Sequence, residues 1–173
     1  QLIGFIIFFL LFSIKLGLEE MSQNIWYSIF HSISSFNNAG FTIFHMGNSL
    51  EPFSRGYLNN IILIVTAIMF FFGGIGYFVI SDLLSHRRVL GKRKIKIVLS
   101  LETKLILIGS FILSSFGFLM IIIFEYSNPA TIGNMSFSEK IINSLFTSMS
   151  TRTAGFNSFE FSATYDYTKL LCA

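Results

Sequence analysis

The chain has 173 residues, of which 53% are hydrophobic and only 12% are charged, with a formal net charge of +3. Because an average soluble domain has about 25% charged residues, this composition excludes an ordinary soluble protein and indicates a membrane protein. The single Cys172 excludes an intrachain disulfide framework, and no group of cysteine and histidine has the spacing of a metal site. We therefore expect no bound cofactor and no structural metal.

Two uncharged stretches, Ile61 to Ile80 and Leu105 to Phe124, are long enough to cross a bilayer. A span needs about 20 apolar residues, and a helix satisfies every backbone group within its own segment. A third apolar stretch, Leu2 to Ile14, is too short to span alone. We interpret it as the end of a helix that starts upstream, since the chain opens on Gln1, and we expect an internal fragment of an all-α membrane protein.

A short segment between the two spans holds six of the 12 lysine and arginine residues. These are Arg87, Arg88, Lys92, Arg93, Lys94 and Lys96. Such a cluster is compatible with binding to nucleic acid or to anionic lipid. Beside membrane spans it is more simply a topology signal, so the positive-inside rule predicts a cytoplasmic loop and we expect no nucleic-acid partner.

The segments on the opposite side of the membrane each contain a semi-apolar stretch, Ile25 to Phe36 and Ile141 to Met149. Each stretch is too short to cross the bilayer and too apolar to lie in water, which is typical of a re-entrant helix. Ser136 and Glu139 have the spacing of a capping box and predict where the second of these helices starts. A glycine loop follows each stretch.

The two glycine loops align at a shift of 115 residues, so that Ser35-Phe-Asn-Asn-Ala-Gly-Phe41 meets Ser150-Thr-Arg-Thr-Ala-Gly-Phe156. The serine, alanine, glycine and phenylalanine are identical in the two loops. Because the match falls at the same place in two similar series of segments, it predicts an internal repeat.

Both loops have the order polar, small, glycine, aromatic, which is also the order in the filters of potassium channels. Irregular backbone at membrane depth is tolerated only where it lines a pore or is buried in protein, and rings of carbonyls can replace the hydration shell of potassium. The predicted filter residues are Asn38, Ala39, Gly40 and Phe41 in the first loop, and Thr153, Ala154, Gly155 and Phe156 in the second.

The electrostatics of these loops also favour a cation, because the preceding helices would point their partially negative C-terminal ends toward the pore. No carboxylate lies between Trp26 and Asn48 or between Ile141 and Phe159, which argues against the acidic ring of a calcium-type filter. Arg152 is a basic residue beside the second loop. We predict that it supports the filter from behind, by hydrogen bonds to loop carbonyls or to a carboxylate.

Three further residue types have structural interpretations. Gly73, Gly74 and Gly76 are expected to allow close helix packing rather than to break the helix. His31 is expected to be packed and hydrogen-bonded, and Lys15 to extend toward the lipid headgroups.

Three stretches together are similar to the Trk/Ktr/HKT family of potassium transporters, most closely to the bacterial Ktr-type membrane subunit. They are Phe30-His-Ser-Ile-Ser-Ser-Phe-Asn-Asn-Ala-Gly-Phe41, Phe72-Gly-Gly-Ile-Gly-Tyr77 followed by Asp82-Leu83, and Ser150-Thr-Arg-Thr-Ala-Gly-Phe-Asn157. The resemblance implies a potassium-channel-like fold of four helix, pore loop and helix repeats around one pore. It also implies a homodimer that works with a cytoplasmic nucleotide-binding regulatory subunit.

On this resemblance, residues 1–85 form the second repeat, residues 86–102 the basic cytoplasmic loop, and residues 103–173 the third repeat up to its inner helix. The predicted function is potassium uptake across the cytoplasmic membrane, with the potassium ion as substrate. A sodium-permeable relative and a non-conducting membrane anchor or assembly subunit are the alternatives. An enzyme is not expected, because neither uncharged span contains an ionisable acid, a base or a cysteine.

Overall fold

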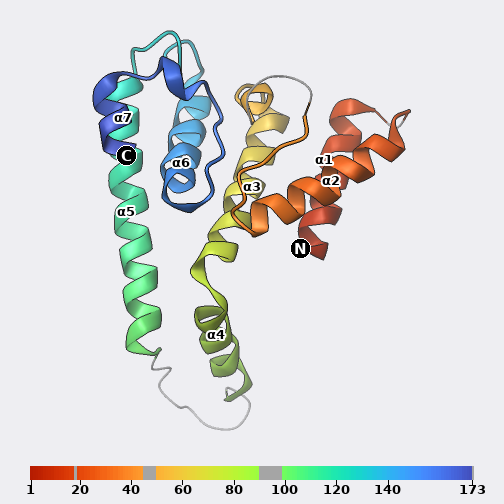
Figure 1. The fold of residues 1–173 in the computed structure, drawn as a ribbon, viewed down its shortest axis with the longest axis vertical. Helices are drawn as coiled ribbons and strands as arrows, with labels where there is room; N and C mark the ends of the chain where they lie inside the picture. The colour runs from red at the N-terminus through yellow and green to blue at the C-terminus, as the bar shows by residue number, and fades with distance from the viewer. Residues whose placement is uncertain (18, 45–49, 90–98, 173) are drawn as a thin grey trace.

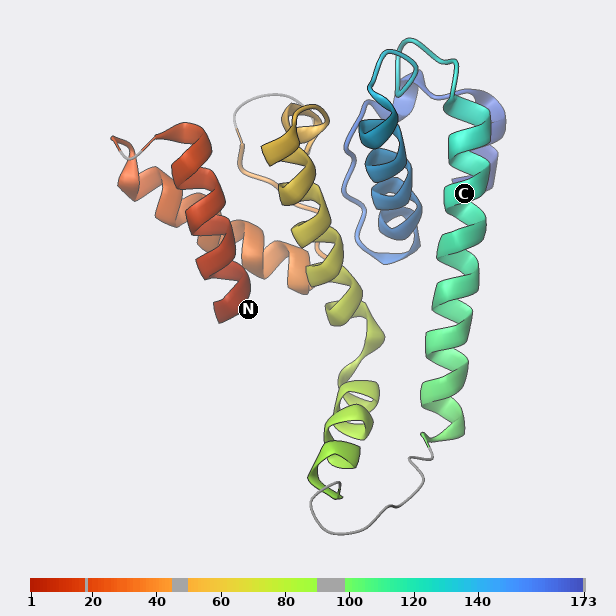
Figure 2. The ribbon, with the colours of Figure 1, turned by 180° about the vertical axis from the view of Figure 1, so that it is seen from behind.

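The computed structural model describes residues 1–17, 19–44, 50–89 and 99–172, which form helices and connecting loops without a strand in these ranges (Figures 1 and 2). The all-α class predicted from the sequence is confirmed for these residues. Of the predicted cytoplasmic loop, residues 90–98 lie outside the described part of the chain. The α-helices are α1 Leu2–Leu16, α2 Met21–Phe36, α3 Tyr57–Ile75, α4 Tyr77–Val89, α5 Leu101–Glu125, α6 Phe137–Thr153 and α7 Asp166–Cys172, with short 3-10 turns η1 Glu51–Phe53 and η2 Phe161–Ala163.

Two of these helices, α3 and α5, are long and apolar enough to cross a membrane. α5 has 25 residues, which at about 1.5 Å per residue is more than the hydrocarbon core requires. Large apolar side chains, including Phe111, Ile112 and Phe116, are exposed along it. This outward apolar surface is the pattern of a helix that faces lipid or another apolar helix.

The helices are arranged so that α3 stands between α2 and α6 (Figure 1). α1 packs on α2 at one side, and α5 packs on α6 at the other. The buried apolar core, which includes Phe8, Phe12, Leu63, Phe70 and Phe146, lies among these helices. Both predicted re-entrant stretches fall within α2 and α6, the two helices on either side of α3.

Helix α3 ends sooner than the uncharged run predicted. Gly76 has a φ of 88°, a left-handed conformation that interrupts the helix before α4, so the run Ile61 to Ile80 is not one continuous helix (Figure 2). The packing interpretation is therefore wrong for Gly76, where a Cβ atom would meet nothing within 4 Å. It is confirmed for Gly73, because a Cβ atom there would collide with the backbone carbonyl of Phe36 at the end of α2.

Two polar side chains of α1 and α2 lie among apolar groups. His31 is buried, its Nε2 lies 2.9 Å from Oγ1 of Thr66, and its ring packs edge-on against Phe8, as expected. Lys15 differs from the expectation. Its Nζ donates to Oδ1 of Asn59 over 2.7 Å and lies 3.8 Å from the centre of the Phe53 ring, so the ammonium points into the protein and not toward headgroups.

The predicted capping box at the start of α6 is confirmed. Oε2 of Glu139 accepts a hydrogen bond from the backbone N–H of Ser136 over 2.9 Å. Its Oε1 accepts from the backbone N–H of Gly56 over 2.7 Å, which joins the start of α6 to the start of α3. These hydrogen bonds, that from Gly56 above all, lower the pKa of Glu139 below its usual 4.5.

We expect Glu139→Gln to lower the stability of the protein at neutral pH by about 0.5–1 kcal/mol, the usual effect of losing a helix cap. A carboxylate whose pKa is lowered by folding stabilises the protein above its unfolded pKa, and the contribution is lost as pH falls through the folded pKa. The measurement is thermal unfolding in detergent at pH 7 and below pH 4.5. The difference between the variant and the natural protein should shrink at the lower pH.

The control is Glu102→Gln, which changes an acidic residue in the first turn of α5. It keeps the comparison at a helix N-terminus but leaves the connection between α6 and α3 intact. An equal loss of stability in both variants at every pH would contradict this role of Glu139.

Candidate ion-selectivity site

The two glycine loops are in direct contact. Loop 1 comprises residues 37–44, after α2, and loop 2 comprises residues 154–160, after α6. A Cβ atom on Gly40 would collide with the carbonyl oxygen of Ala154 and lie 3.3 Å from the carbonyl carbon of Gly155. The structure thus brings together two stretches that only a sequence alignment had related.

The backbone at both glycines is left-handed. Gly40 has a φ of 71° and Gly155 a φ of 72°, a conformation that residues with a Cβ atom adopt at a cost. Asn38 is also left-handed, with a φ of 53°, and asparagine is among the residues that tolerate this best. Both loops therefore turn sharply as they leave their helices.

The carbonyl groups of these turns lack a hydrogen-bond donor in the part of the chain that the structure describes. Within the described residues, no group donates a hydrogen bond to the carbonyl oxygens of the three residues that end with each glycine. These residues are Asn38, Ala39 and Gly40 in loop 1, and Thr153 at the end of α6 with Ala154 and Gly155 in loop 2. Three of the six residues, Ala39, Thr153 and Gly155, are exposed, so this unpaired set in two touching loops is open to water or to a cation.

The next carbonyl in each loop is paired in the same way. Oγ of Ser34 donates to the carbonyl of Phe41 over 2.6 Å, and Oγ of Ser150 donates to the carbonyl of Phe156 over 2.6 Å. The sequence alignment had matched Ser35 with Ser150. Oγ of Ser35 is buried and has no hydrogen-bond partner in the described part of the chain.

Ser34 is a residue that the sequence reasoning missed. The donating serine and the accepting phenylalanine are seven positions apart at loop 1 and six at loop 2, so the aromatic residues align at a shift of 115 and the serines at a shift of 116. Helix α6 runs to Thr153, whereas α2 ends at Phe36. An alignment of α2 with α6 alone, at a shift of 116, would have paired Ser34 with Ser150.

Two polar side chains, Asn38 of loop 1 and Thr153 at the end of α6, lie against α3. The position of a Cβ atom on Gly74 is 3.0 Å from the side-chain amide of Asn38 and 3.6 Å from Oγ1 of Thr153. With its amide turned so that nitrogen faces Phe70, Asn38 donates to the carbonyl of Phe70 over 3.0 Å and accepts from the N–H of Gly74 over 3.1 Å. Gly74 of α3 therefore makes room for the Asn38 side chain of loop 1.

The aromatic residues of the two loops have different surroundings. Phe156 is only 1% exposed, and its ring packs against those of His31 and Phe70 at centroid distances of 5.7 and 6.5 Å. Phe41 is 69% exposed. The second loop is thus held by helices of the first half of the chain, and the first loop lacks an equivalent cover among the described residues.

Arg152 lies in the last turn of α6 and is partly buried. Its guanidinium has no hydrogen bond or ion pair with the residues that the structure describes, so a brace to the loop carbonyls is not formed within them. A cation at this position interacts favourably with the negative end of the helix dipole. Its role as filter support stays a prediction.

Comparison with known proteins gives the family. Residues 1–172 match the profile of TrkH, described as a cation transport protein. The chain belongs to the TrkH family. This confirms the Trk/Ktr resemblance, and the family is one of ion transporters and not of enzymes. Together with two helices long enough to span, it identifies a membrane protein.

Three curated relatives are similar to this TrkH-family chain. It is 37% identical over 140 residues to Ktr system potassium uptake protein B of Bacillus subtilis, covering 81% of this chain and 29% of that protein. It is 38% identical over 135 residues to the protein of the same name from Vibrio alginolyticus, covering 78% and 28%. It is 35% identical over 165 residues to potassium/sodium uptake protein NtpJ of Enterococcus hirae, covering 93% and 32%. The chain thus spans about a third of the length of these relatives.

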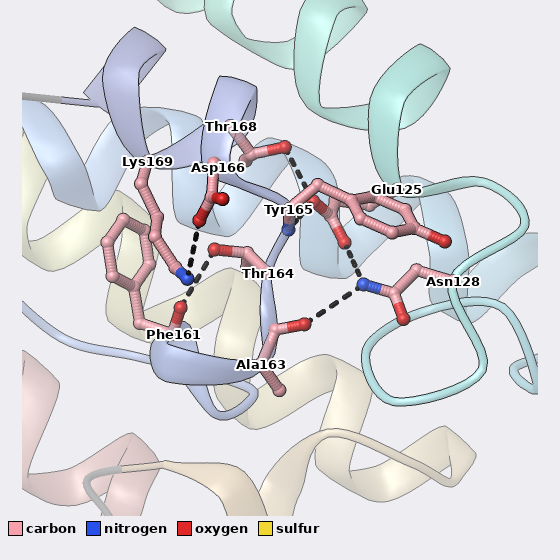
Figure 3. Close-up of polar contacts among 9 residues, drawn as sticks. All are labelled: Glu125, Asn128, Phe161, Ala163, Thr164, Tyr165, Asp166, Thr168 and Lys169. Atoms are coloured by element: carbon pink, nitrogen blue, oxygen red, sulfur yellow. Dashed lines mark hydrogen bonds and ion pairs between the residues drawn. The ribbon is translucent and has the colours of Figure 1, made fainter.

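A buried carboxylate fixes the segment that follows loop 2 of this TrkH-family chain (Figure 3). Glu125, at the end of α5, is fully buried, and Oε1 accepts from the N–H of Tyr165 over 3.0 Å and from Oγ1 of Thr168 over 2.5 Å. Oε2 accepts from Nδ2 of Asn128 over 2.7 Å and from Oγ1 of Thr131 over 2.8 Å. These four donors saturate the carboxylate, so it connects α5, the following loop and α7 and is not itself free to bind a cation.

We expect Glu125→Ala to destabilise the protein by about 3 kcal/mol or more, because it leaves several buried donors without an acceptor. Glu125→Gln should cost less, since the amide oxygen still accepts. Thermal unfolding in detergent measures both. The control is Glu160→Gln, because Glu160 is exposed and accepts only from Ser162 among the described residues. An equal loss of stability in this variant would argue against the role of Glu125 in connecting α5 to α7.

Proposed function

We propose that this chain supplies two filter segments of a potassium uptake protein in the cell membrane. The observation that carries the proposal is the pair of touching loops, each with three carbonyls that no described donor occupies. A row of such oxygens can replace the water around a potassium ion, and no carboxylate lies in either loop between Asn38 and Phe41 or between Thr153 and Phe156. The names of the curated relatives, potassium or potassium/sodium uptake proteins, agree with this proposal.

The two short helices favour a cation at the same place. α2 and α6 have 16 and 17 residues and end directly at loops 1 and 2. Their buried faces are polar, with serine, asparagine and threonine side chains, while apolar residues such as Ile29 and Leu145 are exposed. We propose that both are re-entrant helices inside a helix bundle, which aim their partially negative C-terminal ends at the ion path.

A comparison of the two halves supports a ring of similar repeats. At a shift of 116, the residues of α6 that face α3 correspond to an apolar groove of about 270 Å³ on α2. The α6 residues are Ile142, Leu145, Phe146 and Met149, and the α2 residues are Trp26, Ile29, Phe30 and Ile33. In loop 1, Phe41 borders this groove and is exposed, whereas its counterpart Phe156 is buried. We propose that the inner helix of a preceding repeat covers the groove, as α3 covers α6.

The proposed division keeps residues 1–85 as one repeat and residues 103–173 as part of the next, joined by a cytoplasmic loop at 86–102. It makes the protein multi-pass. A homodimer and a cytoplasmic nucleotide-binding regulatory subunit complete the proposal, and two of the relatives are named as parts of a Ktr system. No nucleic acid and no bound cofactor is part of it.

Sodium permeation is the second candidate, since one relative is named a potassium/sodium uptake protein. Both visible loops contain glycine at the left-handed position, which favours potassium because the carbonyl can turn toward the ion without hindrance from a side chain. A membrane anchor would need neither the unpaired carbonyls nor the repeated loop. Rescue of potassium-uptake-deficient cells by the intact gene separates a transporter from an anchor.

We expect Gly40→Ser in the intact gene to lower the preference for potassium over sodium at least about tenfold, equivalent to about 1.4 kcal/mol. The serine Cβ would collide with the carbonyl of Ala154 and would strain a φ of 71°, so both loops must shift. The measurement is uptake of rubidium, as a potassium analogue, and of sodium into deficient cells, with the amount of protein in the membrane determined in parallel.

The control is Gly109→Ser, because Gly109 lies on α5, has an ordinary backbone conformation and has open space where a Cβ atom would be. Its ratio of rubidium to sodium uptake should match that of the natural protein. An unchanged ratio in Gly40→Ser would count against the filter.

A further inference from the structure

The serine hydroxyls at the ends of α2 and α6 form the same closed arrangement twice. The carbonyl of Ser34 accepts from the N–H of Ala39 over 2.9 Å while its hydroxyl donates to the carbonyl of Phe41 over 2.6 Å. The carbonyl of Ser150 accepts from the N–H of Gly155 over 3.0 Å, and its hydroxyl donates to the carbonyl of Phe156 over 2.6 Å. One residue therefore holds both the beginning and the end of each turn.

The arrangement recurs although the two loops differ by one residue in length. Ser34 and Ser150 are also almost fully buried, at 4% and 1% exposure. A buried serine has one proton to donate, and in both loops it goes to the carbonyl after the glycine and not to one of the three before it. Two loops of different length make the same contact between a serine hydroxyl and the carbonyl after the glycine. This indicates that the site requires the contact.

We infer that Ser34 and Ser150 are positioning residues that determine where the filter ends. By holding the carbonyls of Phe41 and Phe156 toward the helices, they leave three carbonyls of each loop to face the ion. The inference rests on the proposed function and goes beyond it, because it assigns ion selectivity in part to two side chains outside the glycine loops.

The physical basis is that a carbonyl filter discriminates ions by the number and the geometry of its oxygens. A released Phe41 or Phe156 carbonyl can rotate, and the turn that it closes loses one of its two connections to the helix. A looser loop with an additional oxygen tolerates the shorter coordination distances of sodium better than the fixed loop does. Loss of either hydroxyl should therefore change selectivity more than it changes the amount of folded protein.

The chain offers a matched control in Ser35, the neighbour of Ser34. Its hydroxyl is fully buried but has no partner in the described residues, so its removal tests the loss of a buried serine hydroxyl without the loss of a loop contact. Threonine at position 34 or 150 retains a hydroxyl at the same place on the side chain. It therefore tests whether the hydrogen bond, and not serine as such, is needed.

The experiment uses the intact gene in potassium-uptake-deficient cells, with rubidium and sodium uptake measured per amount of protein in the membrane. Ser34→Ala and Ser150→Ala should each lower the ratio of rubidium to sodium uptake by about fivefold, within the range that one buried hydrogen bond supports. Ser35→Ala should leave the ratio unchanged. Ser34→Thr and Ser150→Thr should restore most of it.

An unchanged ratio in both alanine variants would overturn the inference, whether or not their amounts in the membrane fall, because the serines would then only stabilise the helix ends. An equal fall in the ratio for Ser35→Ala would also overturn it. Absence of uptake by the unaltered gene would instead overturn the proposed function, and the inference with it.

Discussion

The close approach of loop 1 to loop 2 is the contact on which the rest of the structure depends. Gly40 lies so near the carbonyl of Ala154 that no side chain fits between them. This contact requires α2 and α6 to end at one place, and α3 to lie between them with Gly73 and Gly74 facing loop 1 and the end of α2. The helices outside this centre, α1 and α5, complete the packing around it (Figure 1).

The polarity of the chain follows from the same arrangement. The faces of α2 and α6 that turn inward are rich in serine, asparagine and threonine, whereas α5 exposes phenylalanine, leucine and isoleucine. In a soluble protein this distribution would be unfavourable, because apolar surface would meet water. In a bilayer it is expected, since inward polar groups find partners within the bundle and apolar groups face lipid.

Polar contacts outside the two loops connect the helices of the two halves. Glu139 joins the starts of α6 and α3, and Glu125 joins the end of α5 to α7. Asn143 of α6 donates to the carbonyl of Ser54, just before α3, over 2.8 Å. Four donors saturate the Glu125 carboxylate, as a buried polar group requires, whereas the carbonyls of residues 38–40 and 153–155 have no hydrogen-bond donor among the described residues. That difference is the basis of our proposal that the loops are the place for an ion.

The sequence by itself determined properties that depend on local order: the apolar segments that contain the spanning helices α3 and α5, and the capping box of Ser136 and Glu139. These follow from composition and from contacts within a few residues. It did not determine the break at Gly76. Tertiary structure alone decided that Ser34 and not Ser35 holds loop 1, that Lys15 binds Asn59, and that Gly40 meets Ala154. Gly40 and Ala154 lie more than a hundred positions apart in the sequence. No periodicity along the chain encodes which helix faces meet.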